Sequence, residues 1–150
     1  MKNYLFLIAI VVSGFSFAQP SEPTFTEVEF KPVLRNETMQ QQQQSFEKKM
    51  VAAFKSGNAE LIGKYFSDNI DLSIDAKEDL YSNSQSEQIL KNFFIAHPPK
   101  DFKIIHKGKS GQSEYFIGEL KADANYRVTL NSKSIGGVNK ITSLTIELED

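Results

Sequence analysis

The chain has 150 residues, 40% of them hydrophobic, and a formal net charge of −2 at pH 7. This length fits one domain with a modest core, and the mild negative charge gives no general attraction for nucleic acid or anionic membranes. Cysteine is absent, which excludes disulfides, thiolate metal sites, a cysteine nucleophile and a lipid-modified cysteine.

Residues 1–18 have the features of a cleavable export signal. Lys2 provides the positive start, the apolar run follows from Tyr4 to Val12, and a Ser-Phe-Ala sequence with small residues at both ends closes at Ala18. The apolar run is too short to span a bilayer, which takes about 20 residues. We therefore expect export to the periplasm or the medium, cleavage between Ala18 and Gln19, and no stable membrane anchor.

Residues 19–44 are expected to form a flexible tail or linker. They contain three prolines, mixed charges and the run Gln40 to Gln44, without a sustained hydrophobic period. A helical extension through the glutamines is an alternative, because Gln is a fair helix former. One functional interpretation of this segment is a tether that spaces the domain from an envelope partner.

A single domain is predicted over residues 45–150, beginning with two helices. The first has apolar residues on one face and ends at Ser56-Gly57. The second follows the N-cap residue Asn58, and residues 67–69 are expected to break it. The apolar positions of the two helices are Phe46, Met50, Val51 and Phe54, then Leu61, Ile62, Tyr65 and Phe66.

Alternation from Ile70 to Ile74 predicts a half-buried strand with its acidic side chains facing solvent. A polar loop is expected over residues 76–83, and a third helix after it. Its capping box is either Ser84 with Glu87 or Ser82 with Gln85. The apolar face of this helix comprises Ile89, Leu90, Phe93 and Phe94, and Pro98-Pro99 ends it.

Four strand-like runs complete the chain, over residues 102–107, 113–122, 126–131 and 138–149. The turns between them are too short for crossover helices, so neighbouring strands should be antiparallel. Helices grouped ahead of such strands indicate the α+β class, with three helices in the N-terminal half packed on a curved, mainly antiparallel sheet.

This order of elements resembles the nuclear transport factor 2-like superfamily, in which a curved sheet wraps around helices as a cone. The stretches FKSGNAELIGKYFSDNIDLSI, KEDLYSNSQSEQILKNFF and FKIIHKGKSG are similar to an uncharacterised family of exported Bacteroidetes proteins in that superfamily. The resemblance covers roughly residues 45–149. It implies a cone-like fold and supplies no catalytic residues.

A concave pocket is the natural place for a ligand in such a fold. Strand parity puts His106 on the same face as Phe102 and Ile104, so we expect it to point inward, and Tyr81 and Tyr126 are the further pocket candidates. His97 ends a helix, where a cation is favourable next to the last carbonyls, and we expect it to be structural. The histidines are not at metal-ligand spacing, so no metal or other cofactor is expected.

These features favour a non-enzymatic exported domain that binds a small molecule or an envelope protein. A homodimer through the outer sheet face, with Tyr115 and Ile117, belongs to the same interpretation. The alternative is a small enzyme of the isomerase or dehydratase type that uses His106 with Tyr81 or Tyr126. Exposure of His106 would remove the basis of that alternative.

Overall fold

The structure is a computed structural model, and it describes the backbone of residues 33–149 and the side chains of residue 41 and residues 44–149. The predicted signal, its cleavage site between Ala18 and Gln19, and residues 19–32 lie outside the described residues.

Helix α1 (Val33–Ser56) begins twelve residues before the predicted domain start, so the glutamine run lies inside it. For residues 33–44 the helical alternative therefore replaces the predicted unstructured tail. The buried face of the helix begins at Phe46 and includes Met50 and Phe54. Gly57 follows with a φ of +63°, the left-handed conformation that glycine adopts readily and that ends helices.

Helix α2 (Ala59–Gly63) is shorter than predicted. The side chain of Asn58 caps it by accepting a hydrogen bond from the amide of Leu61 at 2.9 Å. Phe66 already belongs to strand β1, so the predicted break over residues 67–69 is wrong. Ser67 there donates from its hydroxyl to the carbonyl of Ile141 at 2.8 Å, which fastens the start of β1 to the neighbouring strand.

The six strands form one sheet in the order β2-β1-β6-β5-β4-β3. All neighbouring pairs are antiparallel except β1 and β6, which are parallel and are connected through helix α3 (Asn83–Ala96) and the four other strands. The strands are β1 (Phe66–Ile74), β2 (Lys77–Ser82), β3 (Asp101–Ser110), β4 (Ser113–Lys121), β5 (Asn125–Ile135) and β6 (Val138–Leu148).

Strand β2 corrects the prediction of a polar loop over residues 76–83. Its first four residues, Lys77 to Leu80, are all exposed, and their sequence shows no alternation of apolar and polar positions. An edge strand needs no such alternation when neither face is covered. The strand ends at Ser82, which with Gln85 forms the capping box of helix α3 (Asn83–Ala96), the second of the two predicted boxes.

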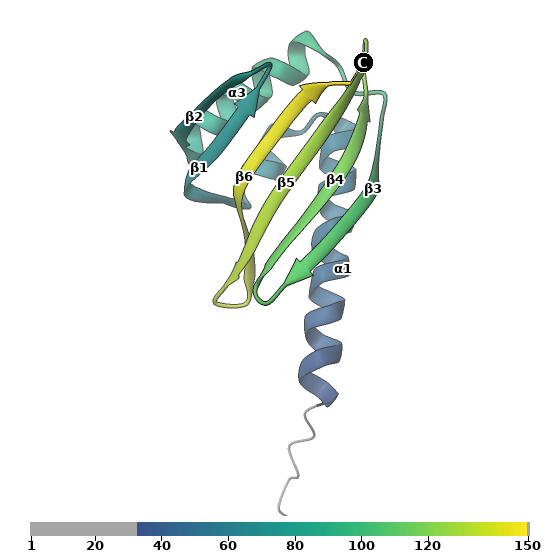
Figure 1. The fold of residues 1–150 in the computed structure, drawn as a ribbon, viewed down its shortest axis with the longest axis vertical. Coiled ribbons are helices and arrows are strands. Elements are labelled where there is room, and N and C mark those ends of the chain that lie inside the picture. Colours follow the sequence, from purple (N-terminus) through teal and green to yellow (C-terminus); the bar gives the residue numbers. More distant parts are fainter. Residues whose placement is uncertain (1–32, 150) are drawn as a thin grey trace, which may run out of the picture. The chain divides into compact units, whose positions relative to one another are not determined.

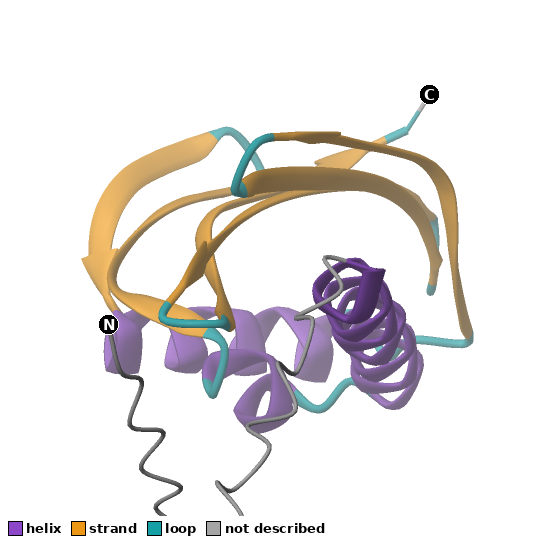
Figure 2. Cartoon of the chain, turned by 90° about the horizontal axis from the view of Figure 1, so that it is seen from below, coloured by secondary structure: helices purple, strands orange, loops and turns teal. Residues whose placement is uncertain are grey.

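The sheet curves over the helices, which all lie on its concave side (Figure 1, Figure 2). The core fills this concave space and is rich in phenylalanine: Phe54 stacks on Phe102 at 4.7 Å between ring centroids and meets the edge of Phe94 at 6.0 Å. This arrangement confirms the predicted α+β class and curved sheet. Among the described residues, no helix is both long and apolar enough to cross a bilayer.

Candidate functional site

A cavity of about 350 Å³ opens between α3 and the β1–β2 hairpin. We call this end of the sheet, which carries the β1–β2 turn and His97, the histidine end. Most of the cavity wall is apolar, formed by Leu72, Ile74, Ile89, Phe93 and Ala96. Its polar lining comes from Asp75, Lys77, Tyr81 and His97. A mainly apolar wall with a few polar groups is typical of small-molecule sites.

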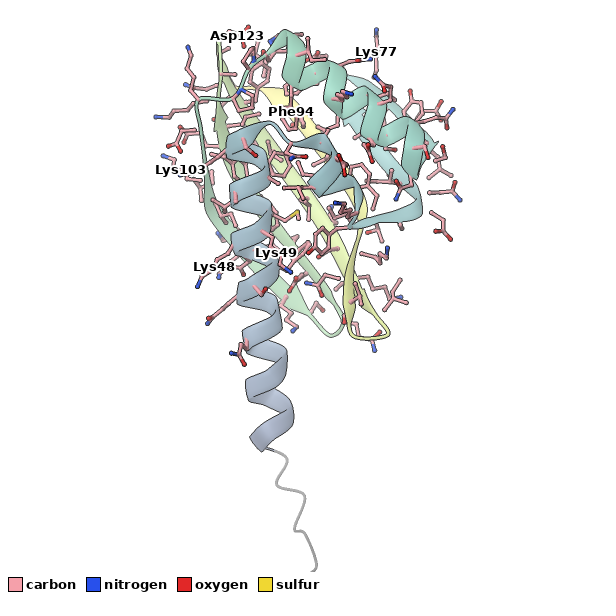
Figure 3. All side chains as sticks on the ribbon, turned by 180° about the vertical axis from the view of Figure 1, so that it is seen from behind. Lys48, Lys49, Lys77, Phe94, Lys103 and Asp123 are labelled. Atoms are coloured by element: carbon pink, nitrogen blue, oxygen red, sulfur yellow. The ribbon has the colours of Figure 1, made fainter. Side chains whose placement is uncertain are left out.

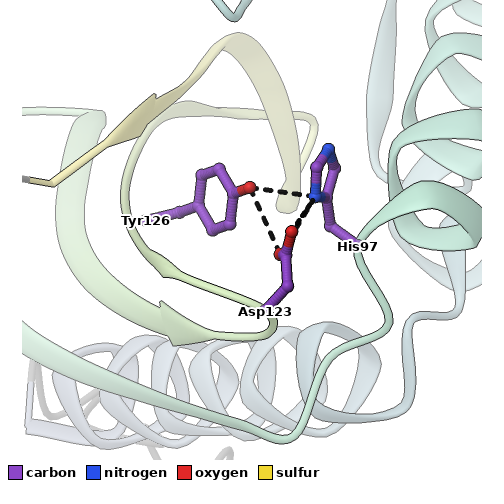
Figure 4. Close-up of polar contacts among 3 residues, drawn as sticks. All are labelled: His97, Asp123 and Tyr126. Atoms are coloured by element: carbon purple, nitrogen blue, oxygen red, sulfur yellow. Dashed lines mark hydrogen bonds and ion pairs between the residues drawn. The ribbon is translucent and has the colours of Figure 1, made fainter.

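His97 is held by Asp123, in the turn between β4 and β5, and by Tyr126 of strand β5 (Figure 4). Its Nδ1 atom lies 2.9 and 3.0 Å from the two carboxylate oxygens of Asp123 and 2.9 Å from the hydroxyl oxygen of Tyr126. The Tyr126 hydroxyl also donates to Asp123 at 3.3 Å. The three side chains therefore form a closed triangle around one ring nitrogen.

This triangle determines which nitrogen of His97 carries the proton. An ionised carboxylate only accepts hydrogen bonds, so Nδ1 must be the donor toward Asp123. In the neutral imidazole Nε2 is then an acceptor with a free lone pair. Figure 4 shows Nε2 pointing away from both partners, and within residues 33–149 it has no hydrogen-bond partner.

The pKa values of the two partners reflect the same contacts. The hydrogen bond from His97 lowers the pKa of Asp123 and so favours its carboxylate form. Burial raises the pKa of Tyr126, and the negative charges of Asp123 and Asp75 raise it further. Asp123 is therefore the charged member of the triangle, and Tyr126 is its neutral hydroxyl.

Aromatic packing fixes the ring of His97 in this position. The Phe93 ring lies 4.9 Å from the His97 ring and meets Tyr126 edge-on at 5.2 Å, between ring centroids. Phe93 is one helical turn before His97, and its carbonyl accepts the His97 amide at 2.8 Å. The end of helix α3 thus supplies both the His97 ring and the Phe93 ring that packs against it. Pro98-Pro99 follow directly and end the helix.

The β1–β2 turn brings charged groups to the cavity through a strained backbone. Ile74 pairs with Lys77, which leaves Asp75 and Ala76 as a two-residue turn. Their φ angles are +51° and +61°, values that glycine and asparagine adopt more readily than alanine. Strained conformations of this kind cluster at functional sites.

The structure brings together two of the three predicted pocket residues. Tyr81 lines the cavity and Tyr126 is buried beside it in the triangle. His106 is not with them: it is exposed and pairs with Ile117 on the outer face of the sheet. A bulge between Ile104 and His106 inserts one residue and reverses the predicted facing.

The isomerase or dehydratase hypothesis rested on an inward His106 and therefore loses its basis. The cavity histidine is His97, for which the sequence indicated only a structural role. Asp123 was missed as well, since it lay in a predicted turn 26 residues from its partner. The described residues hold no group of three or more His, Cys, Asp or Glu side chains arranged to bind a metal ion.

A second cavity, of about 220 Å³, lies toward the opposite end of the sheet, near the β3–β4 turn. We call this the glutamate end. Glu47 of α1 accepts from Lys107 at 2.9 and 3.0 Å, and Glu114 accepts from the Asn139 amide at 2.6 Å. Burial raises the pKa of Glu114. The charged groups named here already have protein partners.

Residues 47–147 match the sequence model of a protein family described as a domain of unknown function (DUF4783). The chain belongs to this family. Solved DUF4783 structures are similar: one from Bacteroides uniformis is 29% identical with a TM-score of 0.66, covering 69% of this chain and 96% of that one. One from Bacteroides ovatus is 23% identical with a TM-score of 0.66, covering 68% and 94%.

The fold of the wider superfamily that the sequence resembles is also found. An NTF-2 like protein of unknown function from Silicibacter pomeroyi is 13% identical with a TM-score of 0.56, and the match covers 76% of this chain and 98% of that one. No curated protein matches the chain. The DUF4783 protein therefore has an NTF2-like fold, and its function must be argued from its own site.

Proposed function

We propose that this DUF4783 protein binds a small, largely apolar molecule in the cavity at the histidine end. The observation that carries the proposal is that Nε2 of His97 has no hydrogen-bond partner within residues 33–149. His97 lines the apolar cavity, and its other ring nitrogen, Nδ1, is already bonded to Asp123 and Tyr126. A fixed polar group in an apolar pocket orients a ligand, while burial of the ligand's apolar body supplies most of the affinity.

The size of the cavity supports this function. Its volume of about 350 Å³ falls within the range of roughly 300–1,000 Å³ found for small-molecule sites. Preorganisation supports it too, because a ring already fixed by Phe93, Asp123 and Tyr126 loses little freedom when a ligand binds. No proton transfer is needed for this role.

Native mass spectrometry of the protein isolated from its own envelope tests the proposal. We expect a retained small molecule in the wild-type protein and at least about a ten-fold lower occupancy in His97→Ala, since the ligand loses its polar anchor. His106→Ala is the matched control: it removes the other histidine of the chain, which is exposed on the outer face, and should keep the molecule.

Two results would overturn the proposal. The first is a wild-type protein isolated without any bound molecule, which would contradict small-molecule binding. Equal occupancy in the wild type and in folded His97→Ala would place the molecule elsewhere.

We further propose that the protein acts after export, in the periplasm or medium. The support is the N-terminal sequence, with its short apolar run and a small residue at Ala18. The intact mass of the protein from the envelope fraction should correspond to a chain that begins at Gln19. A mass that includes residues 1–18 would contradict cleavage.

A protein partner, including a second copy of the chain, is the other candidate. Its specific support is the outer sheet face, where Tyr115 is 38% exposed beside His106, at 6.0 Å between ring centroids, and Ile117 is half-buried. The same native spectra would show a dimer, and Tyr115→Lys should dissociate it. A monomer at micromolar concentration would argue against the homodimer.

A further inference from the structure

We propose that the ligand of the cavity at the histidine end is an organic amine, bound as its ammonium ion. The ammonium group would donate to Nε2 of His97 and lie near the carboxylate of Asp75, with the apolar body of the ligand against the aliphatic and aromatic wall. This inference rests on the proposed function and adds the charge class of the ligand.

The hydrogen-bonding character of His97 favours a ligand that carries a donor. Because Nδ1 donates to Asp123, the ring in its neutral form presents a lone pair at Nε2 and no N–H. A ligand that binds this form must therefore supply a donor. An ammonium or hydroxyl group can do so, whereas a carboxylate would place two acceptors against each other.

The balance of charges around the cavity favours a positively charged ligand. Asp75 lines the cavity, and within residues 33–149 its carboxylate has neither an ion-pair nor a hydrogen-bond partner. Lys77 is the lining residue of opposite charge, but it is exposed, and Figure 3 shows its side chain at the outer edge of the molecule, pointing away from the body. Its ammonium group can remain in water.

The pKa of Tyr126 agrees with a negative local potential. Burial is the main cause of its rise, but the charges of Asp123 and Asp75 contribute in the same direction. Two carboxylates, of which Asp75 lines the cavity, therefore act on the same hydroxyl. A potential that disfavours a phenolate favours a cation at the same place.

The aromatic part of the cavity wall also suits an ammonium group. The rings of Phe93 and Tyr81 line the cavity together with the imidazole of His97. Aromatic faces attract ammonium groups through the ring quadrupole, most strongly where water is partly excluded. Aromatic rings next to an unpaired carboxylate suit an amine better than a neutral molecule of the same shape.

Three probes with one apolar body separate these possibilities: phenethylamine, phenethyl alcohol and phenylacetate. Each is titrated into the purified chain beginning at Gln19, in neutral buffer, and the dissociation constant is taken from amide and side-chain NMR shifts around the cavity. We expect phenethylamine to bind at least about ten-fold more tightly than phenylacetate, with the alcohol between them, because charge complementarity sets this specificity.

Asp75→Asn tests the source of the preference, and Asp71→Asn is its matched control. Asparagine tolerates the left-handed backbone of position 75, so the turn should survive. Asp75→Asn should weaken phenethylamine about three- to five-fold and leave the alcohol unchanged, as expected for a partly exposed charge pair. Asp71 lies on strand β1, which leads into this turn; it is exposed and outside the cavity lining, and its substitution should change neither.

The outcomes separate the two proposals. Phenylacetate binding as tightly as phenethylamine, or an unchanged preference in Asp75→Asn, overturns the amine inference and leaves a cavity that binds small molecules. Failure of all three probes to perturb the cavity overturns both.

Discussion

The two ends of the concave face use similar residues for different purposes. At the glutamate end, Glu47 pairs with Lys107 and Glu114 with Asn139, so the polar atoms satisfy one another. At the histidine end, Asp123 and Tyr126 both converge on one nitrogen of His97, a cavity-lining residue, and leave its other nitrogen without a partner among the described residues. The first arrangement closes a surface, and the second leaves one atom available to a ligand.

The comparison teaches that a perturbed pKa alone does not identify a functional site in this protein. Glu114 has a raised pKa, yet its carboxylate is already hydrogen-bonded and its shift is mainly due to burial. What distinguishes the histidine end is an unsatisfied, well-oriented acceptor beside an apolar wall.

Removing one aromatic ring from each end should separate stability from binding. Phe93 and Phe46 are similarly buried, and each packs against a tyrosine, Tyr126 and Tyr65 respectively. Phe93→Ala and Phe46→Ala should each lower the free energy of unfolding by about 3 kcal/mol, because a large buried side chain is replaced by a cavity. Urea unfolding followed by circular dichroism measures this loss.

Only Phe93→Ala should also abolish binding of phenethylamine, since Phe93 lines the cavity and supports the His97 ring. If the substitution prevents folding, Phe93→Leu keeps most of the volume and should weaken binding with a smaller loss of stability. Equal weakening by Phe46→Ala would show that the two ends are not independent.

The two hairpin turns provide a smaller contrast. At the glutamate end, Gly136 and Gly137 form the two-residue turn with φ angles of +58° and +79°, while Asp75 and Ala76 adopt similar angles at the histidine end. Ala76→Gly should therefore stabilise the protein by about 1 kcal/mol, and Gly136→Ala should destabilise it by about the same amount.

Thermal unfolding should show the two changes as shifts of roughly 4 °C in opposite directions. A lower melting temperature for Ala76→Gly would mean that the turn carries no strain. Such a result would leave the histidine end without its distinctive backbone.

Much of the fold follows from local sequence. The helix end at Gly57, the cap at Asn58 and the four late strands depend on residues close together in the chain, and the structure has them near the predicted positions. Strand β2 was missed because its exposed edge residues show neither alternation nor apolar character. An edge strand is defined by its neighbour, which periodicity does not detect.

The candidate site was only partly predictable because its contacts are non-local. Tyr81 lines the cavity and Tyr126 contacts the cavity residue His97, but His106 was placed inward by a parity rule that one bulge reverses. Nothing in the neighbouring residues marks that bulge. His97 gains its role from Asp123 and Tyr126, which lie 26 and 29 residues further along the chain.

The smallest expected effect is a pair of opposite pH dependences. The hydrogen bond from His97 lowers the pKa of Asp123, so this carboxylate stabilises the fold above its ordinary value of 3.8, and the contribution is lost as the pH falls below it. Burial raises the pKa of Glu114 above 4.5, so its stabilising form is the protonated one, and that contribution is lost as the pH rises through the folded-state value.

Substitution by the amide should therefore act in opposite directions at the two ends. Asp123→Asn should be less stable than the wild type at neutral pH, and this difference should disappear as the pH falls through the folded-state pKa of Asp123, which lies below 3.8, because protonated aspartate resembles asparagine. Glu114→Gln should match the wild type in acid and exceed it by a few tenths of a kcal/mol at neutral pH, because an amide costs less to bury than a carboxylate. Urea midpoints measured across the acid range give both curves. If the stability difference between variant and wild type changed with pH in the same direction for both substitutions, the two carboxylates would be held in the same way. The contrast between the two ends would then be wrong.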